Sequence, residues 1–432
     1  MEHVVTIKKL IAGGKGLAAL PDGLKVMVPG VLPGETVRIV EKKRCRGYLD
    51  AELLRVLDAS TERVSPPCPF AGRCGGCDLQ HASYPAQLAA KEHILAEALH
   101  RRHLETPELQ PAMPSPAVWG YRYRVRLHLN PEGKLGFHER GSNQVVAINR
   151  CLLATDTINR VIGLLAEAGW PERLKDQFAA LELMECPASG RVFLTLEARD
   201  RRLAGRDAHP LQAELASLVD TVSVKQGKPG ARQPESVPQA TLAQDFSLHG
   251  HSYRLEWESI CFFQVNVQQN NNLIQAALQP LIEADQPFRA LDLFCGMGNF
   301  AIPLGVLGGD VVGVEHNQHS IQWAQHNSDQ AGLKTARFLA DDVERQLHRL
   351  LKRNRQFDCV LLDPPRQGLG PAAALIPLLE PRLIISVSCD PATLARDLAL
   401  ITKNGYHLTR VVPVDMFPHT HHVESLSFLE RN

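Results

Sequence analysis

The C-terminal part of the sequence repeats a pattern of β-strand, turn and helix, and this pattern constrains the fold more strongly than any other feature. From about residue 286 the pattern runs through FRALDLFCGMGNFAIPL, DVVGVEHNQHSIQWAQHN, TARFLADDVE, FDCVLLDPPRQGLG and RLIISVSCDPATLARDL. Each segment starts with an apolar run of strand length, and strands that alternate with helices build a sheet of mostly parallel strands. We therefore predict an α/β fold with a doubly wound, mostly parallel sheet for residues 256–432.

Length and charge limit the organisation of the chain and its partners. A chain of 432 residues is too long for one hydrophobic core, so we expect two or three domains. Its 47 Lys and Arg residues balance its 47 Asp and Glu residues, so any surface that binds nucleic acid must be local. No run approaches the ~18 apolar residues of a membrane span, and the N-terminus lacks the apolar core of a signal peptide. These features predict a cytoplasmic protein without membrane contact.

Residues 1–58 are predicted to form a small β-barrel, because β-like segments alternate there with glycine turns. Basic residues outnumber acidic ones in this region: Lys8, Lys9, Lys15, Lys25, Arg38, Lys42, Lys43, Arg44 and Arg46. Such charges can be the solvated surface of any barrel, or they can form the face of an RNA-binding barrel. This region alone leaves both interpretations open.

A cluster of cysteines follows the predicted barrel. Cys68, Cys74 and Cys77 lie in CPFAGRCGGC, and Cys151 lies far downstream. In a long chain without a signal peptide, clustered thiols indicate metal binding or catalysis rather than disulfides. Four thiolates suit tetrahedral zinc or a [4Fe–4S] cluster, and three close cysteines with one remote cysteine favour iron–sulfur. We predict that residues 59–255 form a central α+β domain that carries this site.

Two other central segments carry predictions. The stretch WGYRYRVRLHLN is predicted to be a strand with four basic side chains on one face: Arg122, Arg124, Arg126 and His128. A half-buried edge strand has the same pattern, but three arginines in a row also suit contact with RNA phosphates. Residues 225–245 are polar and rich in Pro, Gly and Gln, so we expect a loop there.

The first strand of the C-terminal pattern ends in a glycine turn, Phe294-CGMGN, that is neither G-x-G-x-x-G nor a P-loop. The motif D-L-F-C-G-x-G-x-F instead resembles the turn of S-adenosylmethionine-dependent methyltransferases, whose glycines let the backbone approach the methionine part of the cofactor. Glu315 ends the second strand, where an acid accepts the ribose hydroxyls. Asp342, with Asp341 beside it, follows the third strand, where an acid can take the adenine amino group. Acids at successive strand ends strengthen the prediction of a methyltransferase.

The next two strand ends carry reactive side chains. Asp363 ends the fourth strand and Cys389 ends the fifth, so both are expected beside the methyl group of the cofactor. A cysteine can be ordinary core filler, but the turn Asp390-Pro391 that follows favours a thiol presented to a substrate. Enzymes that methylate amino groups have an aromatic residue after Asp/Asn-Pro-Pro. Arg366 stands at that position here, which argues against amino methylation.

A thiol is useful when the carbon to be methylated is a poor nucleophile, as C5 of uracil is. A thiolate that adds to C6 makes C5 reactive enough to attack the methyl sulfonium. A base must then remove the proton from C5 so that the thiol can leave. In DMFPHTHHVESLSFLE the best candidate base is Glu424. The nearby His419, His421 and His422 could be catalytic groups or metal ligands, but a loop that supports Glu424 is the favoured interpretation.

With these residues assembled, nearly the whole chain resembles the RNA (uracil-5-)-methyltransferase family. The resemblance is carried by CPFAGRCGGC, FFQVN, LDLFCGMGNF, LLDPPRQG, VSCDPATLARD and DMFPHTHHVE. It implies that Cys389 is the nucleophile and Glu424 the base. It also implies the residues that line the cofactor and uracil site: Gln264, Phe294, Gly296, Gly298, Asn299, Glu315, Asp342 and Asp363. Finally, it implies the ligands of a [4Fe–4S] cluster: Cys68, Cys74, Cys77 and Cys151.

The resemblance extends to domains and substrate. Residues 1–58 look like the family's TRAM domain, an OB-like RNA-binding barrel, and a TRAM domain with an iron–sulfur cluster is typical of the ribosomal RNA branch. The implied activity is methyl transfer from S-adenosylmethionine to C5 of a 23S rRNA uridine, uridine 1939. The expected partner is 23S rRNA, free or in an early large-subunit precursor, with no DNA, and the expected state is a monomer. Two alternatives stay open: the same chemistry on another 23S rRNA uridine or on the T-loop uridine of tRNA, and an iron–sulfur protein that binds RNA without methylating it.

Overall fold

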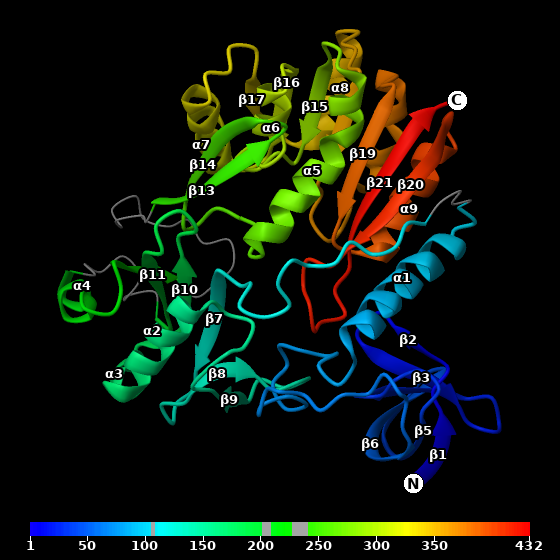
Figure 1. Ribbon diagram of the computed structural model, residues 1–432, viewed down its shortest axis with the longest axis vertical. Coiled ribbons are helices and arrows are strands. Elements are labelled where there is room, and N and C mark those ends of the chain that lie inside the picture. Colours follow the sequence, from blue (N-terminus) through cyan, green and yellow to red (C-terminus); the bar gives the residue numbers. More distant parts are fainter. Residues whose placement is uncertain (105–108, 201–208, 227–240) are drawn as a thin grey trace.

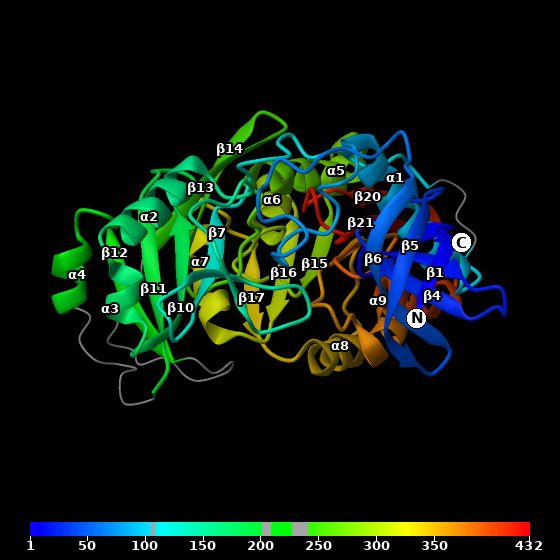
Figure 2. The same ribbon diagram turned by 90° about the horizontal axis from the view of Figure 1, so that it is seen from below.

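The computed structural model describes residues 1–104, 109–200, 209–226 and 241–432. Figure 1 shows an N-terminal sheet region in blue and a central region in cyan and green, both on one side of a larger C-terminal region in yellow to red. Figure 2, viewed from that side, places the N-terminal and central regions at opposite ends of the molecule. Within the described part of the chain, no helix is long and apolar enough to cross a membrane.

The N-terminal region is a six-stranded sheet of order β1-β5-β6-β4-β3-β2. Its strands are β1 (Glu2–Thr6), β2 (Lys9–Ile11), β3 (Lys15–Ala19), β4 (Lys25–Pro29), β5 (Thr36–Cys45) and β6 (Tyr48–Asp58). Buried and exposed positions alternate along these strands because one face of the sheet covers a core. That core contains Val5, Ile7, Val26, Val28, Val37, Ile39 and Leu49. The predicted β-structure of residues 1–58 is confirmed.

The central region combines a six-stranded sheet of order β12-β11-β10-β7-β8-β9 with helices. The strands are β7 (Arg124–Leu129), β8 (Leu135–His138), β9 (Val145–Ala147), β10 (Phe178–Glu185), β11 (Val192–Ala198) and β12 (Thr221–Gln226). The helices are α1 (Tyr84–His100), α2 (Asp156–Glu167), α3 (Trp170–Leu174) and α4 (His209–Leu215). Helix α2 starts where the Thr155 hydroxyl accepts a hydrogen bond from the backbone N–H of Ile158. Its apolar stripe then covers the sheet through Ile158, Val161, Ile162 and Leu165.

A hairpin of β13 (Thr241–Leu248) and β14 (His251–Glu258) leads into α5 (Val267–Ala284). Of the predicted loop 225–245, residues 227–240 lie outside the described residues, and its two ends belong to β12 and β13. The apolar side chains of the hairpin share a core with α5 and with the C-terminal sheet, including Leu242, Leu255 and Trp257. The predicted domain division at residue 256 falls inside β14, and it stays a prediction.

The C-terminal region contains a seven-stranded sheet of order β17-β16-β15-β18-β19-β21-β20. Its strands are β15 (Arg289–Leu293), β16 (Asp310–Glu315), β17 (Arg337–Ala340), β18 (Cys359–Leu362), β19 (Leu383–Ser388), β20 (Tyr406–Val414) and β21 (Glu424–Arg431). The connecting elements are α6 (Ala301–Val306), α7 (Gln318–Gln330), α8 (Val343–Lys352), the short helices η1 (Gly370–Ala374) and η2 (Ile376–Leu379), and α9 (Pro391–Thr402). Strands β15 to β19 are parallel, whereas β21 is antiparallel to β19 and β20.

This sheet confirms the predicted α/β fold and locates its ligand-binding edge. Apolar cores cover both faces of the sheet, and helix α1 of the central region contributes Leu95 and Leu99 to one of them. The strand order reverses between β15 and β18, which is a topological switch point. Ligands in such sheets bind outside the carboxyl ends of the strands at that point.

Candidate active site

The turn after β15 has a backbone conformation that few residue types adopt without strain. Phe294, Gly296 and Gly298 have positive φ angles of 66°, 55° and 98°. A Cβ atom on Gly298 would lie 2.6 Å from Cγ1 of Ile302, so this position has no room for a side chain. A bulky residue at positive φ, such as Phe294, costs of order 1–3 kcal/mol, and such strain clusters at ligand-binding turns. The predicted cofactor turn is therefore a strained and closely packed feature.

Glu315, at the end of β16, is held against this turn. Its Oε2 accepts a hydrogen bond from the backbone N–H of Gly296 at 3.4 Å, and its Oε1 accepts one from Asn317 at 2.8 Å. A carboxylate has about four lone-pair sites. The two that remain suit the ribose hydroxyls assigned to Glu315 from the sequence.

Two other predicted cofactor residues lie around the turn. Asn299 exchanges side-chain hydrogen bonds of 2.9 and 3.2 Å with Asn270 of α5, which fixes the helix against the turn. Gln264 is only 8% exposed, in the segment that joins β14 to α5. The Asn270–Asn299 pair thus joins α5, which directly follows FFQVN, to the glycine turn.

The two acids after β17 differ in their surroundings. Asp341 forms ion pairs with Arg345 and Arg349 of α8. Asp342 is exposed and caps α8, where its carboxylate accepts a hydrogen bond from the backbone N–H of Arg345 at 3.0 Å. Because arginines already neutralise Asp341, Asp342 is the acid with more capacity for a ligand, and its contact with adenine stays a prediction.

Three neighbouring strands bring the predicted reactive groups together. Asp363 follows β18, Cys389 follows β19, and Glu424 begins β21, which lies beside β19. In the β19–β21 ladder Ser388 pairs with Ser425. The antiparallel register therefore places the next residues, Cys389 and Glu424, opposite each other at the end of the ladder.

These groups shift each other's ionisation, as titratable groups of functional sites do. Burial raises the pKa of the Glu424 carboxyl well above its usual range; Asp363 raises it further, and Arg366 opposes the rise. Burial raises the pKa of the Cys389 thiol to about 11, with a further rise from Glu424 and opposition from Arg366. Burial also raises the pKa of Asp363 to about 7. The free site thus favours neutral groups, and a cation bound among them would favour the ionised forms.

The histidines before Glu424 are packed against other parts of the chain. The rings of His419 and Trp119 stack with centroids 3.7 Å apart. Nδ1 of His421 lies 2.6 Å from Oδ2 of Asp78. Burial lowers the pKa of both His419 and His422 to about 4, so both are neutral at neutral pH. Their packing supports the interpretation that they form a loop that holds Glu424.

One candidate residue was missed from the sequence. Phe262 is 72% exposed and lies two residues before the buried Gln264. An exposed aromatic ring is suited to stack on a base, and this one lies in the same segment as the predicted site residue Gln264. The signal in the sequence was the doublet Phe262-Phe263, of which a turn can bury only one ring.

The four predicted cysteine ligands surround one cavity of about 90 Å³: Cys68, Cys74, Cys77 and Cys151. Arg122 also lines this cavity, and its buried Nε has no hydrogen-bond partner among the described residues. Across those same residues, no group of three or more His, Cys, Asp or Glu side chains could hold a single metal ion. The four thiols and Arg122, whose guanidinium also lies near the rings of Tyr121 and Phe417, line the same cavity.

The structure corrects the prediction of an RNA-facing arginine ladder. Strand β7 is not an edge strand, because it lies between β10 and β8. Arg124 forms an ion pair with Glu182 at 2.9 Å, and Arg126 forms one with Glu197 at 2.8 Å. Arg122 lies at the cysteine cavity instead. Glu182 on the neighbouring strand β10 and Glu197 on β11 neutralise Arg124 and Arg126, so the ladder offers little free positive charge to RNA.

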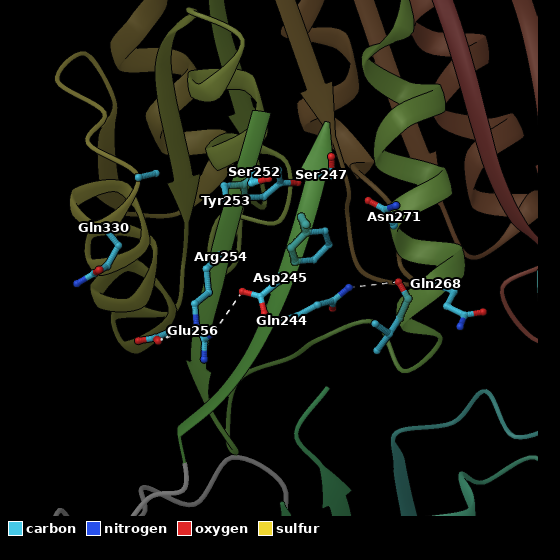
Figure 3. A pocket seen from close by; sticks show the side chains of 13 residues that line it. Gln244, Asp245, Ser247, Ser252, Tyr253, Arg254, Glu256, Gln268, Asn271 and Gln330 are labelled. Atoms are coloured by element: carbon cyan, nitrogen blue, oxygen red, sulfur yellow. Dashed lines mark hydrogen bonds and ion pairs between the residues drawn. The ribbon is translucent and has the colours of Figure 1, made fainter. Parts of the chain in front are cut away.

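An open groove of about 910 Å³ lies between the β13–β14 hairpin and α5. Figure 3 shows its polar lining, in which Arg254 forms ion pairs with Asp245 and Glu256. Gln244 donates a hydrogen bond to the carbonyl of Val267 at 3.3 Å. The predicted catalytic and cofactor residues do not line this groove, and its charges are paired within the hairpin. It is therefore separate from the site at the strand ends.

Comparison with known proteins relates the whole chain to RNA methyltransferases. Residues 83–432 match the family described as tRNA (Uracil-5-)-methyltransferase. The chain is 34% identical to the 23S rRNA (uracil(1939)-C(5))-methyltransferase RlmD of Alkalilimnicola ehrlichii, over 99% of this chain and 96% of that protein. It is 35% identical to the protein of the same name from Shewanella amazonensis, over 98% and 94%. Its fold matches that of the Pyrococcus abyssi tRNA (uracil-54, C5)-methyltransferase in complex with S-adenosyl-L-homocysteine, with a TM-score of 0.74, 24% identity and 99% of both chains covered.

Proposed function

The chain belongs to the tRNA (uracil-5-)-methyltransferase family, and we propose that it methylates C5 of one uridine in 23S rRNA, uridine 1939. The observation that carries this proposal is the meeting of Asp363, Cys389 and Glu424 at the ends of adjacent strands beside a strained glycine turn. Relatives that bear the 23S rRNA name match this chain over nearly their full length. This favours ribosomal over transfer RNA. We propose that the enzyme acts as a monomer in the cytoplasm, on free 23S rRNA or an early large-subunit precursor.

S-adenosylmethionine supplies the methyl group on a positively charged sulfur. We assign its binding to the carboxyl ends of β15, β16 and β17. Glu315 accepts the ribose hydroxyls, Asp342 accepts the adenine amino group, and the turn at Gly296 and Gly298 carries the methionine part. The residues that complete the cofactor and uracil site are Gln264, Phe294, Asn299 and Asp363.

Cys389 is the proposed nucleophile. Its thiolate adds to C6 of the uracil, the electron pair moves to C5, and C5 then takes the methyl group. A thiol with a pKa of about 11 is almost fully protonated at neutral pH, so the occupied site must favour the thiolate. The positive charge of the methyl donor acts in that direction.

Glu424 is the proposed base. After methyl transfer, C5 carries both a proton and the methyl group. The Glu424 carboxylate takes this proton, the electron pair of the C–H bond restores the C5–C6 double bond, and the Cys389 thiolate leaves. Glu424 is only 3% exposed, and burial raises its proton affinity, which helps it to accept a proton from carbon.

The target uridine must leave the RNA stack to reach Cys389, and we propose that the ring of Phe262 replaces part of the lost stacking. We also propose that residues 1–58 are a TRAM domain that holds the RNA backbone. Half of its ten Lys and Arg residues form ion pairs within the protein: Lys9, Lys15, Arg38, Lys42 and Arg44. The other five have no ion-pair partner among the described residues and remain available for phosphates: Lys8, Lys25, Lys43, Arg46 and Arg55.

We propose that the cysteine cavity holds a [4Fe–4S] cluster bound by Cys68, Cys74, Cys77 and Cys151. Burial raises the pKa of the Cys74, Cys77 and Cys151 thiols, and the nearby Arg122 cation opposes the rise. Arg122 thus favours the thiolate forms that a cluster requires. Methyl transfer needs no electrons, so we assign the cluster a structural role.

The test is transfer of labelled methyl from S-adenosylmethionine to separate pools of unmodified 23S rRNA and tRNA. Label recovered as 5-methyluridine at position 1939 of 23S rRNA is the expected result. Label at another 23S rRNA uridine or only on tRNA would keep the chemistry and overturn the target. If the protein binds S-adenosylmethionine but labels neither RNA, the substrate assignment is wrong. If it does not bind S-adenosylmethionine, a non-methylating iron–sulfur RNA-binding protein becomes the better description.

A further inference from the structure

The segment that precedes Glu424, residues 415–423, is held mainly by side chains from outside the C-terminal region. We call residues 415–423 the base segment; Figure 1 shows it in red beside α1. At its start, the fully buried Asp415 forms an ion pair with Lys91, which is 1% exposed. Asp415 also accepts a hydrogen bond of 2.8 Å from the hydroxyl of Tyr84. Because both partners belong to α1, this helix fixes one end of the base segment.

The middle of the base segment is anchored just as firmly. The backbone N–H of His419 donates to the side-chain oxygen of Gln87 at 2.8 Å, and the other end of the same amide lies 3.1 Å from Nδ1 of His419. Trp119 stacks on the His419 ring. The hydroxyl of Tyr121 donates to the carbonyl of Pro418 at 3.0 Å. A residue at positive φ, as His419 is with 66°, persists only where surrounding contacts determine its conformation.

The end of the base segment is joined to residues 68–78, which carry three of the four cysteines of the cavity and which we call the cysteine loop. Asp78, next to Cys77, accepts hydrogen bonds from Nδ1 of His421 at 2.6 Å and from the backbone N–H of His421 at 3.4 Å. The backbone N–H groups of Asp78 and Leu79 donate to the carbonyl of His419, each at 3.0 Å. Two residues separate His421 from Glu424, so this link lies directly before the base.

The N-terminal sheet packs against the contact between Asp78 and His421. A Cβ atom on Gly14, in the turn between β2 and β3, would lie 2.8 Å from Cβ of Asp78 and 3.3 Å from Cβ of His421. Arg140 holds the other oxygen of Asp78 at 3.2 Å and donates to the carbonyl of Cys77 at 2.9 Å. Elements of all three regions therefore converge on the pair Asp78–His421.

From this convergence we propose that Asp78 is a positioning residue for Glu424, through which the cysteine loop controls removal of the C5 proton. The inference rests on the proposed function. It gives the cysteine loop a role in a reaction without electron transfer, because loosening of the loop would free His421 and let Glu424 move. A displacement of about 1 Å in a reacting group costs about 100-fold in rate. Binding of the cofactor, which lies at other strand ends, is not affected.

The test compares the full-length, iron-loaded wild type with Asp78→Ala, His421→Ala and the double variant in single turnovers on unmodified 23S rRNA. We expect each single variant to release methylated RNA roughly 10- to 100-fold more slowly. Because addition to C6 precedes the slowed step, a larger fraction of RNA should be linked covalently to protein on denaturing gels. If the two residues act as one link, the double variant should be no slower than the slower single variant.

Measurements that do not depend on turnover accompany this series. Amide hydrogen exchange at Asp78 and Leu79 should be faster in His421→Ala than in the wild type, because these two N–H groups donate across the contact between the cysteine loop and the base segment. Iron content and affinity for S-adenosylmethionine should stay within about twofold of wild type. His326→Ala is the matched control, since it removes another histidine–carboxylate contact, the 3.0 Å contact between His326 of α7 and Glu256 of β14. It should change neither the rate nor the covalent fraction.

The possible outcomes separate this inference from the function on which it rests. If the wild type methylates 23S rRNA but both single variants keep its rate and covalent fraction, the positioning role is refuted. Additive losses in the double variant, or slow turnover without trapped RNA, refute it as well. If Asp78→Ala loses its iron, His421→Ala decides alone, because its side chain lies outside the cysteine loop. If the wild type itself labels no RNA, the proposed function fails before any variant is compared.

Discussion

Asp363 is expected to reduce the stability of the protein at neutral pH, and its replacement should reveal this cost. Burial raises the pKa of this carboxyl from 3.8 to about 7. Between these two values the folded protein binds more protons than the unfolded chain does. The free energy of unfolding therefore falls as the pH rises through this window, and the cost stays constant above it.

The structure allows an approximate magnitude. A shift of about 3 pKa units corresponds to about 4 kcal/mol at ~1.4 kcal/mol per unit. Because solvent still reaches part of the residue, we expect about half of this, ~2 kcal/mol. Asn has nearly the shape of Asp without its charge, so Asp363→Asn should remove the cost. If the C-terminal region unfolds as one cooperative unit of roughly 150–250 residues, its thermal midpoint should rise by about 4–8 °C at pH 8 and hardly at all near pH 4.

The assay is thermal unfolding of both proteins, followed by circular dichroism between pH 4 and pH 8. Asp358→Asn is a suitable control, because Asp358 lies directly before the other end of β18, is more exposed, and accepts a hydrogen bond of 2.8 Å from the backbone N–H of Arg289. It should show no gain that grows with pH. A constant difference between Asp363→Asn and the wild type from pH 4 to pH 8 would refute the reasoning, and so would an equal gain in the control.

The remaining predictions concern chemistry and the cysteine site. Cys389→Ala should abolish methyl transfer and leave affinity for S-adenosylmethionine, measured by calorimetry, unchanged; residual transfer would remove Cys389 from its role. Glu424→Gln should trap a covalent RNA–protein adduct on denaturing gels, and normal turnover without adduct would point to another base. Phe262→Ala should lower kcat/KM for RNA by roughly 5- to 150-fold, from ~1–3 kcal/mol of stacking, with recovery in Phe262→Trp; equal values for all three would exclude stacking. Cys74→Ser should lose iron and visible absorption under anaerobic purification while Cys45→Ser keeps both, and zinc in the wild type would replace the cluster by a zinc site.

The parts of the fold that depend on local patterns were predictable. A strand followed by a glycine turn and a helix is visible within some twenty residues, and so the C-terminal sheet and the strand-end residues Glu315, Asp363 and Cys389 could be placed. The order of strands in the sheet could not, because the insertion of β21 between β19 and β20 depends on pairing between distant segments. That insertion is what sets Glu424 opposite Cys389.

Long-range charge pairing also explains what the sequence could not reveal. Arg124 and Arg126 alternate as an exposed ladder would, yet their partners Glu182 and Glu197 lie on strands β10 and β11. The sequence around Lys91 is typical of a surface helix. Lys91 is nevertheless buried against the carboxylate of Asp415, which lies more than 300 residues away in the sequence. No local period distinguishes a lysine that faces water from one that faces Asp415.

The contact between α1 and the base segment determines which parts of the chain must stay together in a working enzyme. The family match begins at residue 83, which is the N-cap of α1. A fragment that starts at residue 256 would contain every group proposed to touch the uracil. It would nevertheless leave the carboxylate of Asp415 buried without Lys91, and breaking a buried ion pair in this way typically costs about 3–5 kcal/mol. The smallest transferable methyltransferase therefore includes α1 together with the C-terminal region, and the contact between Asp78 and His421 ties the cysteine loop to the same unit.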